Sequence, residues 1–402
     1  MKVLVVNAGS SSLKYQLFDT LNGDVLAKGI CERIGIGGEI THKVPGRENY
    51  SAQIEMKNHT VATRILVETL CSPTLGVIKS MDEIEAVGHR IVHGGASLKE
   101  SVLVDDEVLK KLEGCLDIAP LHTAAHLMGI HGCLEAMPGK PQVLVIDTAF
   151  HSTMPPEAYT YPLPKDMCEK YHIRRYGFHG TSHRYVSQEM IKILGKPVED
   201  TKIITCHLGN GSSISAIKGG KVIDTSMGFT PLDGFIMGSR CGSIDPAIVP
   251  FIMEKEGMTP EQMNNFMNKN CGFLGVSGGL SSDCRNLGEA VEAGNTDAKL
   301  AIDILTYQIR KYIGAYSAAM NGLDALVFTA GIGENRTEIR RAACENMDFF
   351  GIVLDKEKNE ATKLQGDNVC ISKPESDVKV YVIPTNEELM IAQDTERIVS
   401  SL

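Results

Sequence analysis

The chain has 402 residues, enough for two or three domains, and its formal net charge at pH 7 is −10. This acidic balance argues against sequence-independent nucleic-acid binding, which needs a basic surface, although a few well-placed arginines can still hold an anionic ligand. Apolar residues make up 43% and charged residues 22%, which excludes disorder over most of the length and permits a large core.

Continuous apolar runs predict strands that are covered on both faces. They lie at 2–6, 141–147, 202–208 and 324–330, and each leads into a glycine-rich or polar cluster. Between 296 and 321, apolar residues recur at spacings of three and four, which predicts a long helix. The alternation of strands and helices indicates the α/β class.

Two features bear on where the protein works. No run approaches the ~18 apolar residues of a membrane span, and the N-terminal run leads into Gly9-Ser10, so we interpret it as a strand and expect no membrane partner. The 11 cysteines are scattered and include no C-x-x-C pair, which indicates free, mostly buried thiols in a reducing, cytoplasmic compartment.

A weak internal repeat suggests a duplicated architecture. Residues 3–28 are predicted to form a strand, a Gly-Ser-Ser turn, a strand, a glycine hairpin and a strand, and residues 203–224 repeat this order. Gly9 and Gly211 are 202 positions apart, half the chain. Two similar α/β domains that face a cleft would explain the repeat, and two unrelated Gly-Ser turns are the alternative.

Two stretches interrupt this pattern. Residues 31–60 are rich in glycine with little periodicity, and we expect a loop or flap there. Pro155 and Pro156 mark the expected boundary between the halves.

Glycine-rich segments follow strands at 7–14, 207–213 and 331–335. Their backbone N–H groups and hydroxyls can hold an anion, to which Lys14 adds a charge, and a helix is expected from Arg336. None matches the dinucleotide or P-loop fingerprint. Each could be an ordinary turn, but three of them in one α/β chain favour a nucleotide ligand.

Other candidate site residues stand in unusual surroundings. Arg90 and Arg240 lie between glycines in apolar segments, where an arginine suits a carboxylate or phosphate, or else caps backbone carbonyls. His179 is either functional or a helix-entry residue, and no histidine set has zinc-ligand spacing. Thr385 and Glu388 fit a capping box, which leaves Glu387 available to hold hydrated Mg²⁺.

Taken together, these segments resemble the acetate kinase (acetokinase) family in the actin-like, sugar-kinase-like ATPase superfamily. The matches span residues 3 to 392 in the family's order. They are VVNAGSSSLKY, VGHRIVHGG, APLH, VIDTAFH, YGFHGTSH, HLGNGSS, TPLDGFIMGSRCGSIDP, SSDCR, FTAGIGENR and IPTNEELMIA.

The resemblance implies an α/β protein whose two domains repeat a ribonuclease-H-like fold around a central cleft. Residues 1–150 plus 384–402 would form an acyl and phosphate domain, and residues 151–383 a nucleotide-binding domain. A cytoplasmic homodimer is implied as well. The implied reaction is reversible, Mg²⁺- or Mn²⁺-dependent phosphoryl transfer in line from ATP to acetate, giving acetyl phosphate and ADP. A carboxylate nucleophile is already ionised at neutral pH, so such a site needs charge stabilisation rather than a general base.

The resemblance also implies roles for matching residues. The catalytic residues would be Asp147, His179 and Arg240, and the metal ligands Asn7 and Glu387. Acetate would be bound by Arg90 and by a methyl pocket formed by Val92, Leu121, Phe178 and Pro231. The nucleotide would be bound by Lys14, His207, Leu208, Gly209, Asn210, Gly211, Asp283, Cys284, Arg285, Gly331, Ile332, Gly333, Glu334 and Asn335. Asp147 could orient Arg90 or water rather than transfer a proton.

One departure from the family keeps the acyl chain length open. After Leu121-His122 the family usually continues Asn-Pro, whereas here Thr123-Ala124 follows in an expected loop beside the acyl pocket. Asp233, where the family often has Glu, is a milder change. A propionate or butyrate kinase therefore remains an alternative, and an ATP-driven actin- or chaperone-like binding protein is a remote one.

Overall fold

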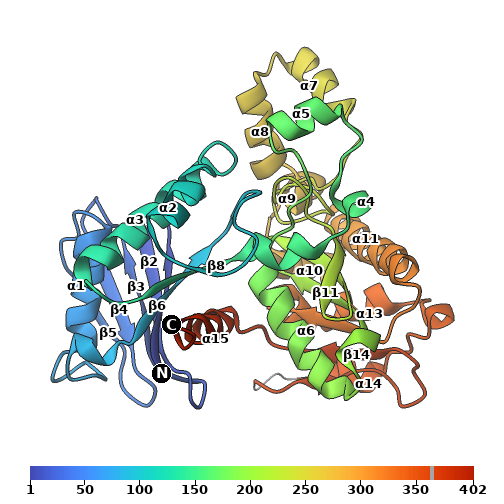
Figure 1. Ribbon diagram of the computed structural model, residues 1–402. Coiled ribbons are helices and arrows are strands. Elements are labelled where there is room, and N and C mark those ends of the chain that lie inside the picture. The colour runs from blue at the N-terminus through green and yellow to red at the C-terminus, as the bar shows by residue number, and fades with distance from the viewer. Residues whose placement is uncertain (363–365) are drawn as a thin grey trace. The chain divides into compact units, whose positions relative to one another are not determined.

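The computed structural model describes residues 1–362 and 366–402, and this chain divides into two compact units (Figure 1). Unit 1 comprises Met1–Ser152 and Asn386–Leu402, and unit 2 comprises Thr153–Thr385. Each unit is built on one mixed sheet with helices packed against it. Within the described residues, every helix is too short or too polar to cross a bilayer.

The sheet of unit 1 has eight strands in the order β5-β4-β3-β2-β1-β6-β8-β7. The central strands β1, β6 and β8 are parallel, and the other neighbouring pairs are antiparallel. The strands are β1 (Lys2–Ala8), β2 (Ser12–Asp19), β3 (Asp24–Glu32), β4 (Glu39–Lys43), β5 (Tyr50–Gln53), β6 (Ala86–Ile91), β7 (Val102–Leu103) and β8 (Gln142–Ile146).

The core of unit 1 follows from alternation along its strands. In β2, Leu13, Tyr15 and Leu17 are buried and pack with α1 (His59–Leu70) and α3 (Pro120–Ala136), whereas Lys14 and Gln16 point to the opposite face. The last helix, α15 (Glu387–Val399), covers that opposite face over β1, β6 and β8.

Unit 2 has six strands in the order β11-β10-β9-β12-β14-β13. Its strands are β9 (Lys202–Leu208), β10 (Ser212–Lys218), β11 (Lys221–Thr225), β12 (Ala325–Thr329), β13 (Val369–Cys370) and β14 (Lys379–Val382). Helix α6 (Gly180–Leu194) packs on β9 and β12, and α11 (Thr296–Met320) packs on β9 and β10. The position of α11 confirms the helix predicted at 296–321.

The two sheets repeat one topology, which confirms the predicted α/β fold with duplicated halves. The order β3-β2-β1-β6-β8-β7 in unit 1 corresponds to β11-β10-β9-β12-β14-β13 in unit 2. Each begins with an antiparallel meander, continues with parallel strands and ends on an antiparallel edge strand. Between β10 and β11, Gly219 and Gly220 both have positive φ, as a two-residue hairpin of this twist requires.

Each unit has further helices and 3₁₀ turns besides those that pack on its sheet. In unit 1 these are α2 (Asp106–Glu113) and the 3₁₀ turns η1 (Met81–Glu83) and η2 (Asp147–Thr153), the last ending just inside unit 2. Helices α5, α7 and α8 gather at one end of unit 2 (Figure 1). Unit 2 holds α4 (Pro156–Tyr159), α5 (Lys165–Lys170), η3 (Val198–Asp200), α7 (Ile248–Glu256), α8 (Pro260–Lys269), α9 (Gly272–Val276), α10 (Cys284–Glu292), α12 (Ala330–Asn335), α13 (Thr337–Cys344), η4 (Asp348–Phe350) and α14 (Lys356–Ala361).

The prediction of a loop or flap at residues 31–60 is wrong. Strands β4 and β5 form a hairpin there and extend the sheet beyond β3. These strands, EITHK and YSAQ, are short and mostly polar, so they lack an apolar run. Backbone pairing with neighbouring strands and packing of Ile40, Tyr50 and Ala52 on the core stabilise them.

Candidate functional site

In unit 1, the predicted site residues lie where parallel strands end. Val5 and its β6 partner Gly88 face α15, since a side chain at Gly88 would collide with that helix. Asn7 and Arg90 each lie two residues further along, and therefore share this face. Asp147 follows the end of β8, the next parallel strand. The carboxyl ends of such strands are a common place for a ligand site.

Arg90 and Asp147 form an ion pair at this edge. Arg90 Nη2 donates to Asp147 Oδ2 at 2.7 Å, and Asp147 is 1% exposed. Asp147 is the main reason that the pKa of Arg90 is raised, with smaller contributions from Glu387 and Glu388. Arg90 Nε is buried and has no hydrogen-bond partner among the described residues. A partly buried guanidinium with a spare donor suits an anionic ligand.

Glu387 belongs to the same charge cluster. Burial raises the pKa of its carboxyl to about 7, against the attraction of Arg90 and with support from the charges of Asp147 and Glu388. Helix α15 begins differently from the prediction, because Asn386 is the N-cap and its side chain accepts from the backbone N–H of Leu389 at 3.1 Å. The predicted capping box of Thr385 and Glu388 is therefore wrong.

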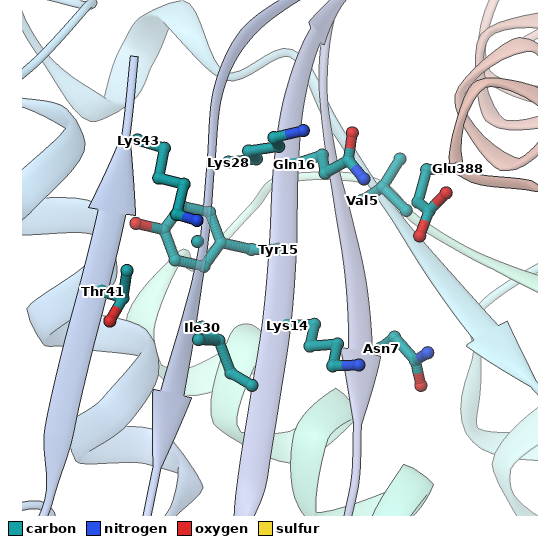
Figure 2. Close-up of a pocket in the computed structure, with 11 residues that line it drawn as sticks. Val5, Asn7, Lys14, Tyr15, Gln16, Lys28, Ile30, Thr41, Lys43 and Glu388 are labelled. Carbon is teal, nitrogen blue, oxygen red and sulfur yellow. The ribbon is translucent and has the colours of Figure 1, made fainter. Parts of the chain in front are cut away.

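Lys14 and Asn7 are direct partners on β2 and β1, and the Lys14 side chain extends toward Asn7 (Figure 2). Both line a pocket of about 400 Å³, together with Glu388 from α15. Lys28 and Lys43 line the same pocket further along the sheet. Across the described residues, no three His, Cys, Asp or Glu side chains cluster as a metal site. Asn7 and Glu387 nevertheless offer oxygen donors of the kind that Mg²⁺ prefers, since Mg²⁺ completes its shell with waters and phosphates.

The residues predicted to form the methyl pocket are divided between the units. Val92 and Leu121 belong to unit 1, Phe178 and Pro231 to unit 2. Leu121 is 82% exposed at the start of α3, which is unusual for a large apolar side chain. The segment after it is helical rather than the expected loop, and the Thr123 hydroxyl donates to the Cys115 carbonyl at 3.3 Å.

In unit 2, the structure brings the predicted nucleotide segments together around one pocket of about 820 Å³. The turn between β9 and β10, the start of α10 and the helix α12 all contribute to its wall. Sequence reasoning missed Ser282 and Arg336, which also line it. The predicted residues that line it are Gly209, Asn210, Asp283, Cys284, Arg285, Gly331, Ile332 and Asn335. The others in this unit do not: His207, Leu208, Gly211, Gly333 and Glu334.

The segment 331–335 is the helix α12 rather than a glycine-rich turn. Arg340, which is fully buried, donates to the carbonyls of Gly333 and Glu334 at 2.9 and 2.8 Å. Burial lowers the pKa of this guanidinium to about 10. Arg340 therefore fixes the end of α12. Its sequence position on an amphipathic helix gives no sign of this role.

Asp283 and Arg285 form a local unit at the start of α10. Asp283 is the N-cap, and its carboxylate accepts from the Arg285 backbone N–H at 2.8 Å and from Arg285 Nη2 at 2.7 Å. This pairing lowers the pKa of Asp283. Arg285 remains 77% exposed, so it can turn toward a ligand at little cost.

His179 and Arg240, predicted to act together, are neighbours in unit 2. His179 has φ +58° at the start of α6, its Nδ1 lies 2.8 Å from Ser213 Oγ, and its ring stacks on His207 at 4.1 Å. Arg240 Nη1 donates to the Pro231 carbonyl at 3.2 Å. A Cβ at Gly211 would lie 3.2 Å from Arg240 Nη1 and 3.8 Å from His179 Nε2. Gly211 therefore leaves space where the side chains of Arg240 and His179 approach the β9–β10 turn.

Comparison with known proteins agrees with this geometry. The acetokinase family model matches residues 2–393. The chain is 56% identical over 404 residues to the acetate kinase of Thermoanaerobacter pseudethanolicus, covering all of both chains. The crystal structure of Porphyromonas gingivalis acetate kinase is similar with a TM-score of 0.95, 49% identity and 99% coverage of each chain. A propionate kinase from Francisella tularensis gives a TM-score of 0.89 and 39% identity, also with 99% coverage of each chain. The chain therefore belongs to the acetokinase family.

Proposed function

We propose that this protein is an acetate kinase that transfers the γ-phosphoryl group of ATP to acetate and forms acetyl phosphate and ADP. The transfer is direct, in line and reversible. Family membership over the whole chain supports the reaction class. The pocket walls in unit 2 and the charge cluster in unit 1 supply the two binding functions that such a transfer requires.

The arrangement around Arg90 is the observation that carries the proposal. Asp147 holds one end of the guanidinium, and the buried Nε has no partner among the described residues. A carboxylate can accept from the remaining donors, and it is ionised at neutral pH, so no general base is needed. Asp147 accordingly serves to orient Arg90, and Arg90 binds the carboxylate of acetate or the acyl phosphate.

The residues of unit 2 account for nucleotide binding and charge stabilisation. The pocket lined by Gly209, Asp283 and Gly331 has room for a nucleotide at about 820 Å³. His179 and Arg240 donate hydrogen bonds to the oxygens of the phosphoryl group as it moves, where negative charge must be stabilised. Lys14 in unit 1 contacts the nucleotide phosphates.

The oxygen donors of Asn7 and Glu387 would hold Mg²⁺, or Mn²⁺ in its place. The ion, when bound, neutralises charge on the phosphate oxygens. Burial of Glu387 next to Glu388 and Asp147 makes an isolated carboxylate costly at this position. A cation relieves that cost, which is the physical reason for placing the ion here.

The test is formation of acyl phosphate from ATP, Mg²⁺ and acetate, propionate or butyrate, trapped with hydroxylamine. Fast product from acetate is expected. Arg90→Ala should abolish it, whereas Arg64→Ala, which removes an exposed arginine of the same unit, should not. ATP hydrolysis without product from any acid would contradict the proposal and favour an ATP-driven binding protein.

A propionate or butyrate kinase is the second candidate. The departure at Thr123-Ala124 and the exposure of Leu121 support it, and a propionate kinase is among the similar structures. One methylene in an apolar pocket is worth only about 1–3 kcal/mol, so overlapping activities are expected. A higher kcat/KM for propionate or butyrate than for acetate would move the assignment to this candidate.

We also propose that the protein works as a cytoplasmic homodimer that binds neither nucleic acid nor membranes. Family membership supports the dimer, and the net charge of −10 supports the absence of nucleic-acid binding. Light scattering coupled to size-exclusion chromatography should give twice the 43.6 kDa chain mass. A monomer at micromolar concentration would contradict the dimer.

A further inference from the structure

Two free cysteines meet beside Arg240. Cys241 directly follows Arg240 in the chain, and Cys271 is the N-cap of α9. Each thiol shifts the pKa of the other, and the Cys241 thiol donates to the Gly242 carbonyl at 3.1 Å. Both side chains are partly exposed, so a small oxidant can reach them.

Backbone hydrogen bonds hold the two cysteines in this position. The Cys271 N–H donates to the Ser239 carbonyl at 3.0 Å, and the Cys241 N–H donates to the Met267 carbonyl at 3.1 Å. Further bonds run from Phe273 to Met237 at 2.8 Å and from Leu274 to Gly238 at 3.0 Å. The segments 237–241 and 267–274 are therefore connected on both sides of the cysteine pair.

The contact is tight next to Cys271. Gly272 has φ +64°, and a Cβ there would lie 2.2 Å from the Met237 carbonyl oxygen and 2.9 Å from the Arg240 backbone nitrogen. The backbone around Arg240 is thus in close contact with the start of α9 and cannot move further toward it. A shift of the Cys241 backbone toward Cys271 must therefore be accommodated by the residues that position Arg240.

The geometry points to Cys241 and Cys271 as a redox modification site that forms a disulfide and displaces Arg240 from its working position. An S–S bond is about 2.05 Å long, shorter than any non-bonded contact between two thiols, so the sulfurs must approach. Arg240 is held by single contacts to Pro231 and to the Met237 sulfur, which a shift of this segment breaks.

Cys241 is the nucleophile of the pair. Interaction with Cys271 lowers the pKa of the Cys241 thiol, whereas interaction with Cys241 and burial raise the pKa of Cys271. The thiolate is the reactive form of cysteine, so Cys241 reacts first and Cys271 resolves the product.

The oxidant is a peroxide, which accepts the two electrons released when the disulfide forms. The Cys241 thiolate attacks one oxygen of hydrogen peroxide, the O–O bond breaks, and the departing hydroxide takes a proton to become water. Cys271 then attacks the sulfur of the resulting sulfenic acid, the S–O bond breaks, and the Cys271 proton leaves with the hydroxide as a second water. Two thiols and one peroxide give one disulfide and two waters, and a dithiol reductant reverses the change.

The test treats the full chain with hydrogen peroxide and maps disulfides by mass spectrometry of the unreduced peptides. A cross-link between the peptides of Cys241 and Cys271 is expected, with at least a tenfold loss of acyl phosphate formation that dithiothreitol restores. Cys271→Ser should resist this reversible loss, keeping its rate within twofold. Cys168→Ser, a matched change at another partly exposed cysteine of unit 2, should still show the loss.

The effect on rate rests on the proposed kinase function, but the cross-link does not. Absence of a Cys241–Cys271 peptide after peroxide treatment would overturn the site. A cross-link that leaves the rate unchanged would overturn its coupling to Arg240. If the untreated protein makes no acyl phosphate, the kinase proposal fails, and peptide mapping still decides whether the cysteines pair.

Discussion

Replacing Asp147 with asparagine tests whether the orientation of Arg90 is essential. The variant keeps the size of the side chain and removes one charge from a pair whose closest atoms are 2.7 Å apart. At a charge separation of about 4 Å and an effective dielectric constant of about 20, the lost attraction is about 4 kcal/mol. Desolvation offsets much of this attraction in the wild-type protein.

The expected cost in stability is smaller than for a fully buried pair. Breaking such a pair typically costs about 3–5 kcal/mol because one charge stays buried without a partner. Arg90 is 21% exposed, and the carboxylates of Glu387 and Glu388 act on it as well. We therefore expect the free energy of unfolding to fall by about 1–3 kcal/mol, measured by urea denaturation.

The effect on rate should exceed the effect on stability. A guanidinium that is free to rotate no longer holds the acetate carboxylate in line, and loss of one such positioned donor costs on the order of 10²-fold in rate. The assay is hydroxylamine-trapped acyl phosphate at saturating ATP and Mg²⁺, with Asp117→Asn on the surface of unit 1 as the control. A folded Asp147→Asn protein that keeps most of the wild-type kcat would refute the reasoning.

Three further perturbations test other parts of the structure. Burial lowers the pKa of His89 to about 4, so the unfolded state binds more protons than the folded state between about pH 6.5 and 4. The free energy of unfolding therefore decreases by up to about 3 kcal/mol as the pH is lowered through this window. His89→Gln should flatten the plot of urea midpoint against pH, and an unchanged slope would argue against a neutral buried imidazole. Gly211→Ala adds a Cβ 3.2 Å from Arg240 Nη1, the far end of a flexible side chain. Tm should therefore barely change, while kcat should drop at least about tenfold because Arg240 is displaced. A variant kcat equal to that of the wild type would show that Arg240 does not need this space. Leu121→Ala should change the free energy of unfolding by no more than about 0.5 kcal/mol because the side chain is 82% exposed. It should nevertheless raise the KM for acetate by up to about tenfold. KM values equal to those of the wild type for acetate, propionate and butyrate would exclude Leu121 from the acyl site.

The sequence by itself determined several of the regular elements and the repeated topology. Apolar runs marked β9 and α11 because a strand or helix that is buried along its length must be apolar at the corresponding spacing. Glycine pairs at hairpins were readable for a similar reason, since positive φ is costly for other residues. Strands β4 and β5 were not readable, because they are short and β4 pairs with β3 and β5 with β4 without an unbroken apolar run.

The candidate residues were also visible in the sequence, but their partnerships were decided only by tertiary structure. Asp147 and Arg90 are 57 positions apart, and parallel pairing of β6 with β8 brings them to one edge. The N-cap of α15 is Asn386 rather than the predicted Thr385, because the Thr385 hydroxyl donates to Ser182 instead. Local pattern reports what a residue can do, whereas long-range strand pairing and burial select which of those contacts it makes. The meeting of Cys241 with Cys271 beside Arg240 follows from the same cause.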